Sequence, residues 1–538
     1  MKQSIAIVEP SGPADLMRVR RARSLRHGAP RRGDPRQGTT QAFRCRRSED
    51  CLSAVPDDLL INILLLIRDA SAAARTSVLS RRWRRVWTLL PELHFLSHND
   101  PHRIRLALTA HQAPALRFLD VAVIDATPDS MVAWLQIAAR RLSGHLRLIN
   151  TEENTSLDEA GETGAFELPC FEDAMSISLE LGRLGLAVPS SGVFARLTNL
   201  FLNRVRLHGP SMLGDAVSWP RCPSLRRLIV HNADGVRNFA IHSDSLLQME
   251  LRNLRSDNAL DLGNFTIRSD SLLRMTLSSL RGLEQLTVMA PALQFLSVSS
   301  CISYSLRNNQ PAANISAPQL ISLQWKDDYH PNYTQLKMEN LERLSAHPFY
   351  VYGQESHKTF NSNCTRLLRR FEVIGVLKLM LLYLPGITNH EYLMEDIKKI
   401  PNTSLMVLEI VANGHSFGAS SFHVLSMCIG VRRLLLKLVD APSHLVTGCP
   451  SGCVCDQPPN WKIEELTLYC LREVEIHNLR GTEHETALMK RLFRWATVLE
   501  KMTVTFHCSV AESKAKEFCQ MLQSFCRPEI SMKGQRFA

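Results

Sequence analysis

Residues 241–254 read IHSDSLLQMELRNL, and residues 267–280 repeat them as IRSDSLLRMTLSSL. Both stretches contain a leucine that is followed by apolar residues three and five positions later. A near-copy at a fixed distance is typical of repeat proteins, in which each unit buries its apolar side chains by stacking on the next one. This repeat decides the fold that we predict for most of the chain.

The same L-x-x-L-x-L pattern recurs before and after these two copies. From Leu197 to Leu320 its successive starts are separated by 28, 21, 26, 21 and 27 residues, near the spacing of roughly 20 to 29 expected of leucine-rich repeats. Half-way units begin at Val236, Leu262 and Leu283. We predict the α/β class, with an irregular leucine-rich-repeat solenoid over residues 98–470 and a parallel sheet on its concave face. An unrelated α/β domain with leucine-rich strands stays open.

A different unit is expected at residues 471–510. The pattern predicts a strand from Leu471, a turn at Arg480-Gly481, an amphipathic helix from Glu483 to Leu499 and a closing strand. Such an edge unit would cover the open end of the solenoid. The charged residues at the helix start, with His484, are expected in solvent. Residues 511–538 are predicted to be a tail.

Residues 51–97 are predicted to form three helices. Pro56, Asp57 and Asp58 favour a helix start, because proline suits the first turn and acidic groups complement the positive helix end. A cap at Asp69 or Ser71 predicts a second helix over residues 72–79. Ser80 predicts the start of a third, which Pro91 ends. The first helix carries one apolar stripe, made of Leu59, Leu60, Ile63, Leu64 and Ile67.

The third helix contains the run TSVLSRRWRRVW, residues 76–87, whose arginines and tryptophans suggest nucleic-acid binding at first sight. At helical spacing, however, Leu79, Trp83, Val86, Trp87 and Leu90 share one face, and the arginines lie mostly outside it. Aromatic side chains that stack on bases are exposed beside basic groups. We therefore predict interior tryptophans and no nucleic-acid site on this helix.

The positive charge is concentrated at the N-terminus. The chain of 538 residues has a net charge of +11, and residues 1–50 hold twelve Lys or Arg against five Asp or Glu, which is +7 of that total. This Arg-, Gly-, Pro- and Ser-rich segment is predicted to be disordered. A nuclear-import signal, an organelle-targeting peptide and a solvated tail are all compatible with it. The rest of the chain is nearly neutral, so nucleic-acid binding is not expected.

The sequence predicts a chain in a reducing compartment, the nucleus, the cytoplasm or both. Its 14 cysteines show no disulfide framework, and the first residues lack a secretory signal. The most apolar stretch, residues 371–387, contains Glu372 and Lys378 and is interrupted by Pro385. Because a membrane span needs about 20 apolar residues, no membrane helix is expected.

Residues 444–455 contain cysteines and a histidine that could bind a metal ion. Cys449, Cys453 and Cys455, with His444 or Cys470 as a fourth ligand, lack the paired C-x2-C spacing of structural zinc sites. We interpret them as a cysteine-rich loop between repeats. The sequence contains no phosphate-binding loop, no dinucleotide motif and no H-E-x-x-H. No metal, no cofactor and no catalytic residue is predicted.

The segment 52–95 resembles the F-box of plant F-box proteins with leucine-rich repeats. The resemblance is carried by residues 56–60, 63–64 and 74–83 and by Trp87, Leu90, Pro91, Leu93 and Phe95. Residues 471–506 resemble the F-box-associated FBD domain, through residues 473–476, Arg480-Gly481, Glu483, residues 494–496 and Thr503-Val504.

The resemblance implies the substrate receptor of an SCF-type ubiquitin ligase, without catalytic residues of its own. In that family the F-box binds a Skp-family adaptor attached to a cullin scaffold, and the repeats present a protein substrate. Val55 stands where leucine is usual, and Leu65-Leu66 replace a spot that is often polar. The implied adaptor contacts are Val55, Pro56, Leu59, Leu60, Ile63, Leu64, Val78, Leu79, Ser80, Trp83 and Trp87, of which about half are expected in the protein's own core.

Two other hypotheses stay open. The chain is a repeat-based scaffold or decoy if it does not engage the adaptor. It is a nucleic-acid-binding protein if the basic segment 1–50 confers salt-dependent binding. The substrate and its contact residues are not predicted.

Overall fold

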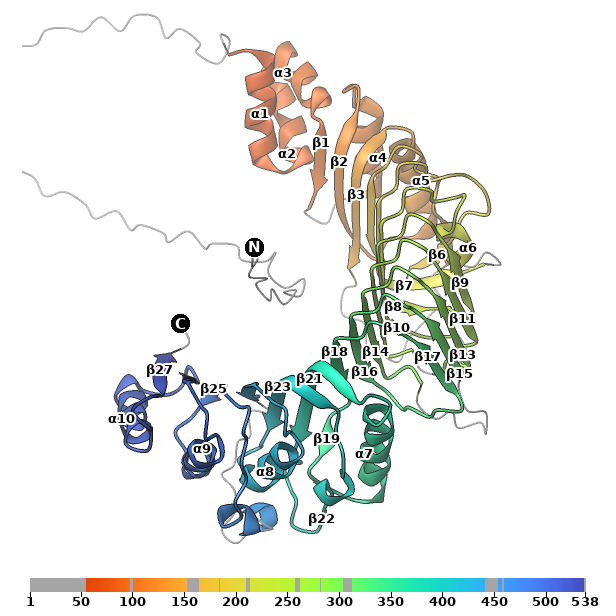
Figure 1. Cartoon of the computed structure of the whole chain (residues 1–538). Helices are drawn as coiled ribbons and strands as arrows, with labels where there is room; N and C mark the ends of the chain where they lie inside the picture. Colours follow the sequence, from red (N-terminus) through yellow and green to blue (C-terminus); the bar gives the residue numbers. More distant parts are fainter. Residues whose placement is uncertain are drawn as a thin grey trace, which may run out of the picture. The chain divides into compact units, whose positions relative to one another are not determined.

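The computed structural model describes residues 55–96, 100–151, 164–182, 184–209, 213–256, 262–280, 282–302, 312–440, 453–456 and 459–536 (Figure 1). Residues 57–538 form one unit, which is described by itself. The predicted disordered segment 1–50 lies outside the described residues. No helix among the described residues is long and apolar enough to cross a membrane.

Three short helices open the unit: α1 (Asp57–Ile67), α2 (Ala70–Arg75) and α3 (Arg81–Val86). Two predicted caps are confirmed, since Asp69 accepts a hydrogen bond from the Ser71 N–H and Ser80 accepts one from the Trp83 N–H. The helix predicted over residues 72–79 begins and ends earlier and continues as the 3-10 turn η2 (Thr76–Val78). A second 3-10 turn, η3 (Trp87–Leu89), follows α3.

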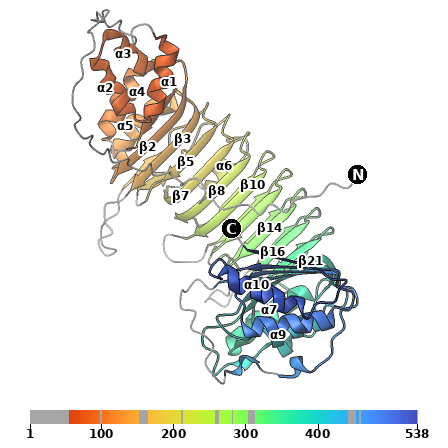
Figure 2. The same cartoon turned by 90° about the vertical axis from the view of Figure 1, so that its left-hand side faces the viewer.

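The main element is a large parallel sheet, which confirms the predicted α/β class. Twenty strands of the described chain belong to it, and consecutive long strands pair with one another in sequence order (Figure 2). Short strands β4 (Ala165–Glu167), β6 (Gly185–Ala187) and β19 (Phe349–Tyr350) join its edges. The long strands are β1 (Glu92–Phe95), β2 (Leu116–Ile124), β3 (Leu142–Thr151), β5 (Ser176–Glu180), β7 (Asn199–His208), β8 (Arg227–Asp234), β10 (Gln248–Leu254), β12 (Arg274–Ser278), β14 (Phe295–Ser299), β16 (Ser322–Lys326), β18 (Arg343–Ala346), β21 (Val373–Leu382), β23 (Asn402–Val411), β24 (Arg433–Leu438), β25 (Glu473–Leu479), β26 (Lys501–Phe506) and β27 (Ser531–Arg536).

The two near-copies of the sequence lie side by side in this sheet. Met249 of β10 is the partner of Met275 in β12, and Leu251 is the partner of Leu277. All four side chains are at most 1% exposed, and the residues between them are partly exposed. Because strand residues alternate between faces, one face of the sheet is apolar and buried and the other is polar.

The half-way units form a second parallel sheet. It contains β9 (Phe239–His242), β11 (Asn264–Arg268), β13 (Gln285–Met289), β15 (Ala312–Ser316) and β17 (Thr334–Lys337). Figure 1 shows these strands as a separate layer beside β8 to β16. Each repeat in this region therefore contributes one strand to each sheet, and the apolar side chains are buried between them.

Helices replace the second sheet elsewhere: α4 (Pro101–Ala110), α5 (Pro128–Ala139), α6 (Leu213–Val217), α7 (Glu355–Leu368), α8 (Gly418–Ser426), α9 (Glu483–Trp495) and α10 (Glu512–Gln523). The last four follow one another along one face of the strands from β21 to β27 (Figure 1). The most apolar stretch of the sequence forms β21, which pairs with β18 and β23. β20 (Tyr352–Gly353), just before α7, pairs antiparallel with β22 (Glu391–Tyr392), and the 3-10 turn η4 (Met394–Asp396) follows β22.

The C-terminal residues depart from the prediction. Residues 511–538 were expected to be a tail, and β26 the closing strand. Instead α10 and β27 continue the pattern, with β27 paired to β26 from Lys501↔Ser531 to Phe506↔Arg536. The prediction was wrong because Met532 and its neighbours carry no leucine triple, so their pairing depends on backbone hydrogen bonds and on α10, whose Phe518 and Leu522 are buried.

At the start of α9, Glu483 is exposed as expected and His484 is partly exposed, but Glu485 is buried. Glu485 is 3% exposed, and its carboxylate accepts hydrogen bonds from the backbone N–H groups of Arg480, Gly481 and Thr482. Thr482 in turn accepts one from the Glu485 N–H, which completes a capping box. Burial raises the pKa of Glu485, and the three backbone hydrogen bonds oppose this by lowering the pKa. The signal in the sequence was the T-x-x-E spacing.

Candidate adaptor-binding surface

Helix α1 carries one broad apolar face, which is buried along one edge and uncovered along the other. Leu60 and Leu64 are 0% and 2% exposed and pack inside the helical segment. Leu59 and Ile63 are 50% and 45% exposed. Each pair has the i, i+4 spacing of one helix face, and the two pairs lie about 100° apart around the helix. The predicted single stripe is therefore present, and the protein covers one edge of it and leaves the other uncovered. We call the uncovered edge the α1 stripe; its members are Leu59, Ile63, Leu66 and Ile67.

A second uncovered apolar site lies between η2 and α3. Val78 is 84% exposed and Leu79 is 62% exposed. Leu79 ends the 3-10 turn, and Ser80 is extended before it caps α3. Leu79 therefore stands outside the helix and does not join the face predicted for it.

The tryptophans are less buried than predicted. Trp83 and Trp87 are only partly buried, whereas Val86 and Leu90 are 0% and 2% exposed. The expected continuous face fails because α3 ends at Val86 and the chain tightens into η3, which changes the angle between successive side chains.

Salt bridges join α1 to α3. The Arg82 Nε lies 2.6 Å from the Asp57 Oδ1, and the Arg85 Nη2 lies 3.6 Å from the Asp57 Oδ2. Arg81 and Arg84 are exposed. An ion pair of this kind near the surface contributes about 0.2 to 1 kcal/mol, so these contacts add little to the stability of the helical segment.

The structure thus separates the predicted contact residues into groups. Leu60 and Leu64 belong to the core, and Trp83 and Trp87 are intermediate. Leu59, Ile63, Val78, Leu79 and Ser80 are exposed. Before this unit, Val55 is partly buried and Pro56 is exposed. Leu66, at 82% exposure, and Ile67, at 42%, were not named as contacts from the sequence.

The polar face of the large sheet carries interacting charges that sequence reasoning did not single out. The His231 Nε2 lies 2.8 Å from the Glu250 Oε1 on the neighbouring strand, and the hydrogen bond lowers the pKa of Glu250. Lys378 and Glu409 pair at 2.9 Å. Such cross-strand pairs become visible only once the register is known.

His94 and Asp120 form another pair on this face. Asp120 is 5% exposed, and its Oδ2 lies 3.8 Å from the His94 Nδ1 and 3.5 Å from the Arg147 Nη1. Hydrogen bonding to Asp120 raises the pKa of His94. These three residues come from β1, β2 and β3.

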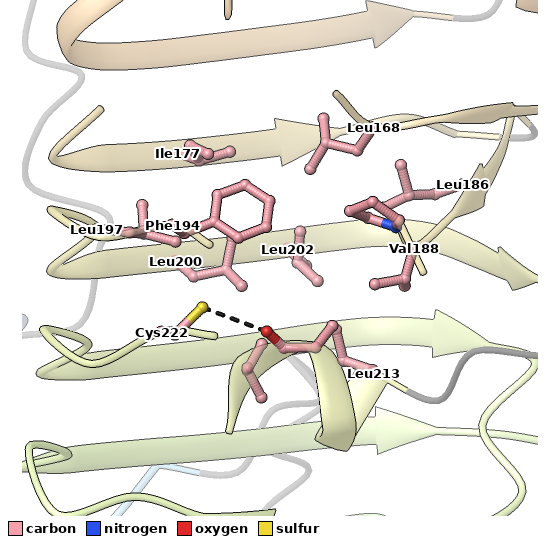
Figure 3. Close-up of a pocket in the computed structure, with 13 residues that line it drawn as sticks. Leu168, Ile177, Leu186, Val188, Phe194, Leu197, Leu200, Leu202, Leu213 and Cys222 are labelled. Carbon is pink, nitrogen blue, oxygen red and sulfur yellow. Dashed lines mark hydrogen bonds between the residues drawn. The ribbon is translucent and has the colours of Figure 1, made fainter. Parts of the chain in front are cut away.

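One apolar cavity of about 30 Å³ lies inside the repeats (Figure 3). Leu200, Leu202, Phe194 and Leu213 line it, and the Cys222 thiol donates to the Ala216 carbonyl oxygen at 3.3 Å. Burial raises the pKa of Cys222 to about 12, so this thiol is unreactive. Ligand pockets have volumes of roughly 300 Å³ or more, and this cavity is a packing gap by comparison.

The possible zinc ligands named from the sequence are only partly brought together. His444 and Cys449 lie outside the described residues, and Cys470 is exposed. Cys453 and Cys455 instead lie beside His415, a residue that sequence reasoning missed. No local spacing could have found it, because 38 residues separate His415 from Cys453.

Comparison with known proteins gives several relatives and no matching family model. An F-box/FBD/LRR-repeat protein of Arabidopsis thaliana is 31% identical over 229 residues, which are 39% of this chain and 48% of the relative. Another protein of that description is 27% identical over 230 residues, 40% of this chain and 48% of the relative. An FBD-associated F-box protein from the same plant is 29% identical over 216 residues, 38% of this chain and 50% of the relative.

The chain spans about half the length of these curated relatives. The matches agree with the F-box and FBD motifs of the sequence and with its repeated strands. The chain is therefore a relative of the plant F-box/FBD/LRR-repeat proteins.

Proposed function

We propose that the chain is the substrate-recognition subunit of an SCF-type ubiquitin ligase. In this proposal residues 51–97 are a three-helix F-box that binds a Skp-family adaptor and, through it, a cullin scaffold. Residues 98–470 are a leucine-rich-repeat solenoid that binds a protein substrate. The FBD-like module of residues 471–510, extended by α10 and β27, covers the last repeat.

One observation carries the adaptor proposal. The α1 stripe, with Val78 and Leu79, leaves six large aliphatic side chains uncovered on a segment of about 45 residues. An uncovered apolar face such as the α1 stripe is typical of an interaction site on a protein surface. Helices that present an apolar face at i, i+4 spacing typically bind a groove or a facing helix of a partner.

The polar face of the large sheet is the proposed substrate surface. Its side chains project from parallel strands in fixed register, and its charges lie in clusters of both signs, such as Glu250 with Arg252 and Arg433 with Glu475. Charge complementarity of this kind selects a partner more than it adds affinity. The chain itself takes no part in the isopeptide chemistry and acts by raising the effective concentration of substrate near the ligase. The nucleus or the cytoplasm is the proposed location.

Co-expression of the full chain with a plant Skp-family adaptor tests the proposal. A 1:1 complex in size-exclusion chromatography is expected. Two separate peaks with a folded chain, shown by circular dichroism, would contradict the ligase assignment and favour the repeat-based scaffold or decoy. Ubiquitin-remnant proteomics after loss of the gene product then identifies the substrate.

A further inference from the structure

Three potential metal ligands lie together beside the C-terminal half of the sheet. His415 follows β23, and Cys453 and Cys455 lie in the long segment between β24 and β25. The Cys453 Sγ is 3.5 Å from the His415 Nδ1, and the ligand atoms of all three residues lie within 4.8 Å of one another. This cluster plays no part in the proposed adaptor or substrate surfaces.

The imidazole of His415 is oriented as a metal ligand requires. Its Nε2 lies 3.3 Å from the Pro385 carbonyl oxygen. Because a carbonyl oxygen only accepts hydrogen bonds, Nε2 carries the proton of the neutral ring, and the lone pair of Nδ1 faces the thiols. Metal-binding histidines usually donate their other N–H to a backbone carbonyl or a carboxylate in this way.

Cys455 sits in a site suited to a thiolate. It is 3% exposed, and its Sγ accepts a hydrogen bond from the Ser416 N–H at 3.3 Å. The residue between the two cysteines is also held in place, since the Tyr352 hydroxyl donates to the Val454 carbonyl oxygen at 2.9 Å. Contacts from two separate segments of the chain therefore position the C-x-C turn against His415.

The spacing agrees with a tetrahedral ion. Zinc binds thiolate sulfur at about 2.3 Å and imidazole nitrogen at about 2.0 to 2.1 Å, so a sulfur and a nitrogen on the same tetrahedral zinc lie about 3.6 Å apart. The observed separation of Cys453 Sγ and His415 Nδ1 is 3.5 Å. Two thiolates and one imidazole form a donor set that favours zinc over magnesium or calcium.

We infer that His415, Cys453 and Cys455 bind one Zn²⁺ ion. The ion would join the segment between β24 and β25 to the loop that follows β23. Its role is structural, because the three ligands come from loops that no strand pairing connects. The same segment contains the 3-10 turn η6 (Pro459–Lys462), whose Trp461 is buried and packs so closely on Gly418 that a Cβ would not fit there.

Zinc content of the purified full chain is the first test. Wild-type protein prepared without chelating resin is expected to hold about one zinc per chain by plasma mass spectrometry. Loss of a residue that only hydrogen-bonds a metal ligand already weakens metal binding about 10- to 100-fold. Replacement of two ligands, Cys453→Ser with Cys455→Ser, is therefore expected to raise the zinc Kd by at least about 100-fold. The matched control is Cys470→Ser with Cys508→Ser, which replaces two exposed thiols outside the cluster and is expected to keep the wild-type content.

Cobalt substitution tests the site without a cysteine variant. Cobalt added to metal-free wild-type protein should give the visible ligand-field bands of a tetrahedral ion and a thiolate-to-cobalt charge-transfer band. His415→Ala should weaken both. A wild-type protein that binds no stoichiometric zinc and gives no such spectrum contradicts the inference. Equal loss of metal in the Cys470/Cys508 control contradicts it too, since the ion would then be held by exposed thiols.

Discussion

Replacement of Leu59 and Leu79 by alanine should weaken adaptor binding without unfolding the protein. The two side chains are 50% and 62% exposed, and they come from the α1 stripe and from the turn before α3. Little packing inside the chain depends on their outer atoms, so the free energy of unfolding should change by less than about 1 kcal/mol.

The size of the effect on binding follows from the exposed fractions. Complete burial of a leucine side chain contributes roughly 1.5 to 3 kcal/mol. About half of each side chain remains to be buried by a partner. The two together should thus contribute about 2 kcal/mol, and their removal should raise the Kd for the adaptor roughly 30-fold.

Biolayer interferometry of the full chain on an immobilised Skp-family adaptor measures this change. The matched control is Leu106→Ala, because Leu106 is 52% exposed on α4 and lies outside the predicted contact set. The reasoning is refuted if the double variant binds within about twofold of wild type while retaining its melting temperature. It is refuted equally if Leu106→Ala has the same effect, since the loss would then be unspecific.

Three further results are expected. Leu60→Ala should destabilise the helical segment by about 2 to 5 kcal/mol, because it opens a cavity at a fully buried site. Hydrogen exchange of the α1 amides should then become faster. Unchanged protection of these amides would contradict the assignment of Leu60 to the core. Glu485→Ala should lower the free energy of unfolding by about 2 to 4 kcal/mol, because three backbone N–H groups lose their acceptor. In the same urea titration Glu483→Ala, at an exposed position of the same first turn, should leave the free energy of unfolding nearly unchanged. Burial raises the pKa of Asp327 to about 6 from 3.8, so the folded protein binds this proton more tightly than the unfolded chain, and stability should fall by up to roughly 3 kcal/mol between pH 4 and pH 6. Asp327→Asn should remove that part of the pH dependence, and an unchanged difference between urea midpoints at the two pH values would show that Asp327 is not its source.

The order of the strands could be predicted from the sequence because the repeats are local patterns. Met249 and Met275 occupy equivalent places in two near-copies, and stacked repeats bring equivalent places together. The caps at Asp69 and Ser80 were likewise predictable, since a capping side chain reaches a backbone N–H only two or three residues away. The F-box and FBD motifs belong to the same category of short-range signals.

The sequence did not predict which leucines of α1 are buried and which are exposed. Leu59 and Leu60 are neighbours of identical chemistry, yet one is half exposed and the other fully buried. Helical periodicity describes which residues share a face, and it does not say which face another element covers. That choice depends on how α2 and α3 pack against α1.

Contacts between residues that are distant in the sequence were the hardest features to predict. His415 meets Cys453 across 38 residues, and α10 with β27 adds a strand that shows no leucine pattern. The sequence by itself determined the parallel repeats, their spacing and the helix starts, because these depend on contacts within one unit or between adjacent copies. Only the tertiary structure decided which leucines stay uncovered, that Glu485 is buried and that a histidine joins two cysteines, because these depend on which surfaces the folded chain brings together.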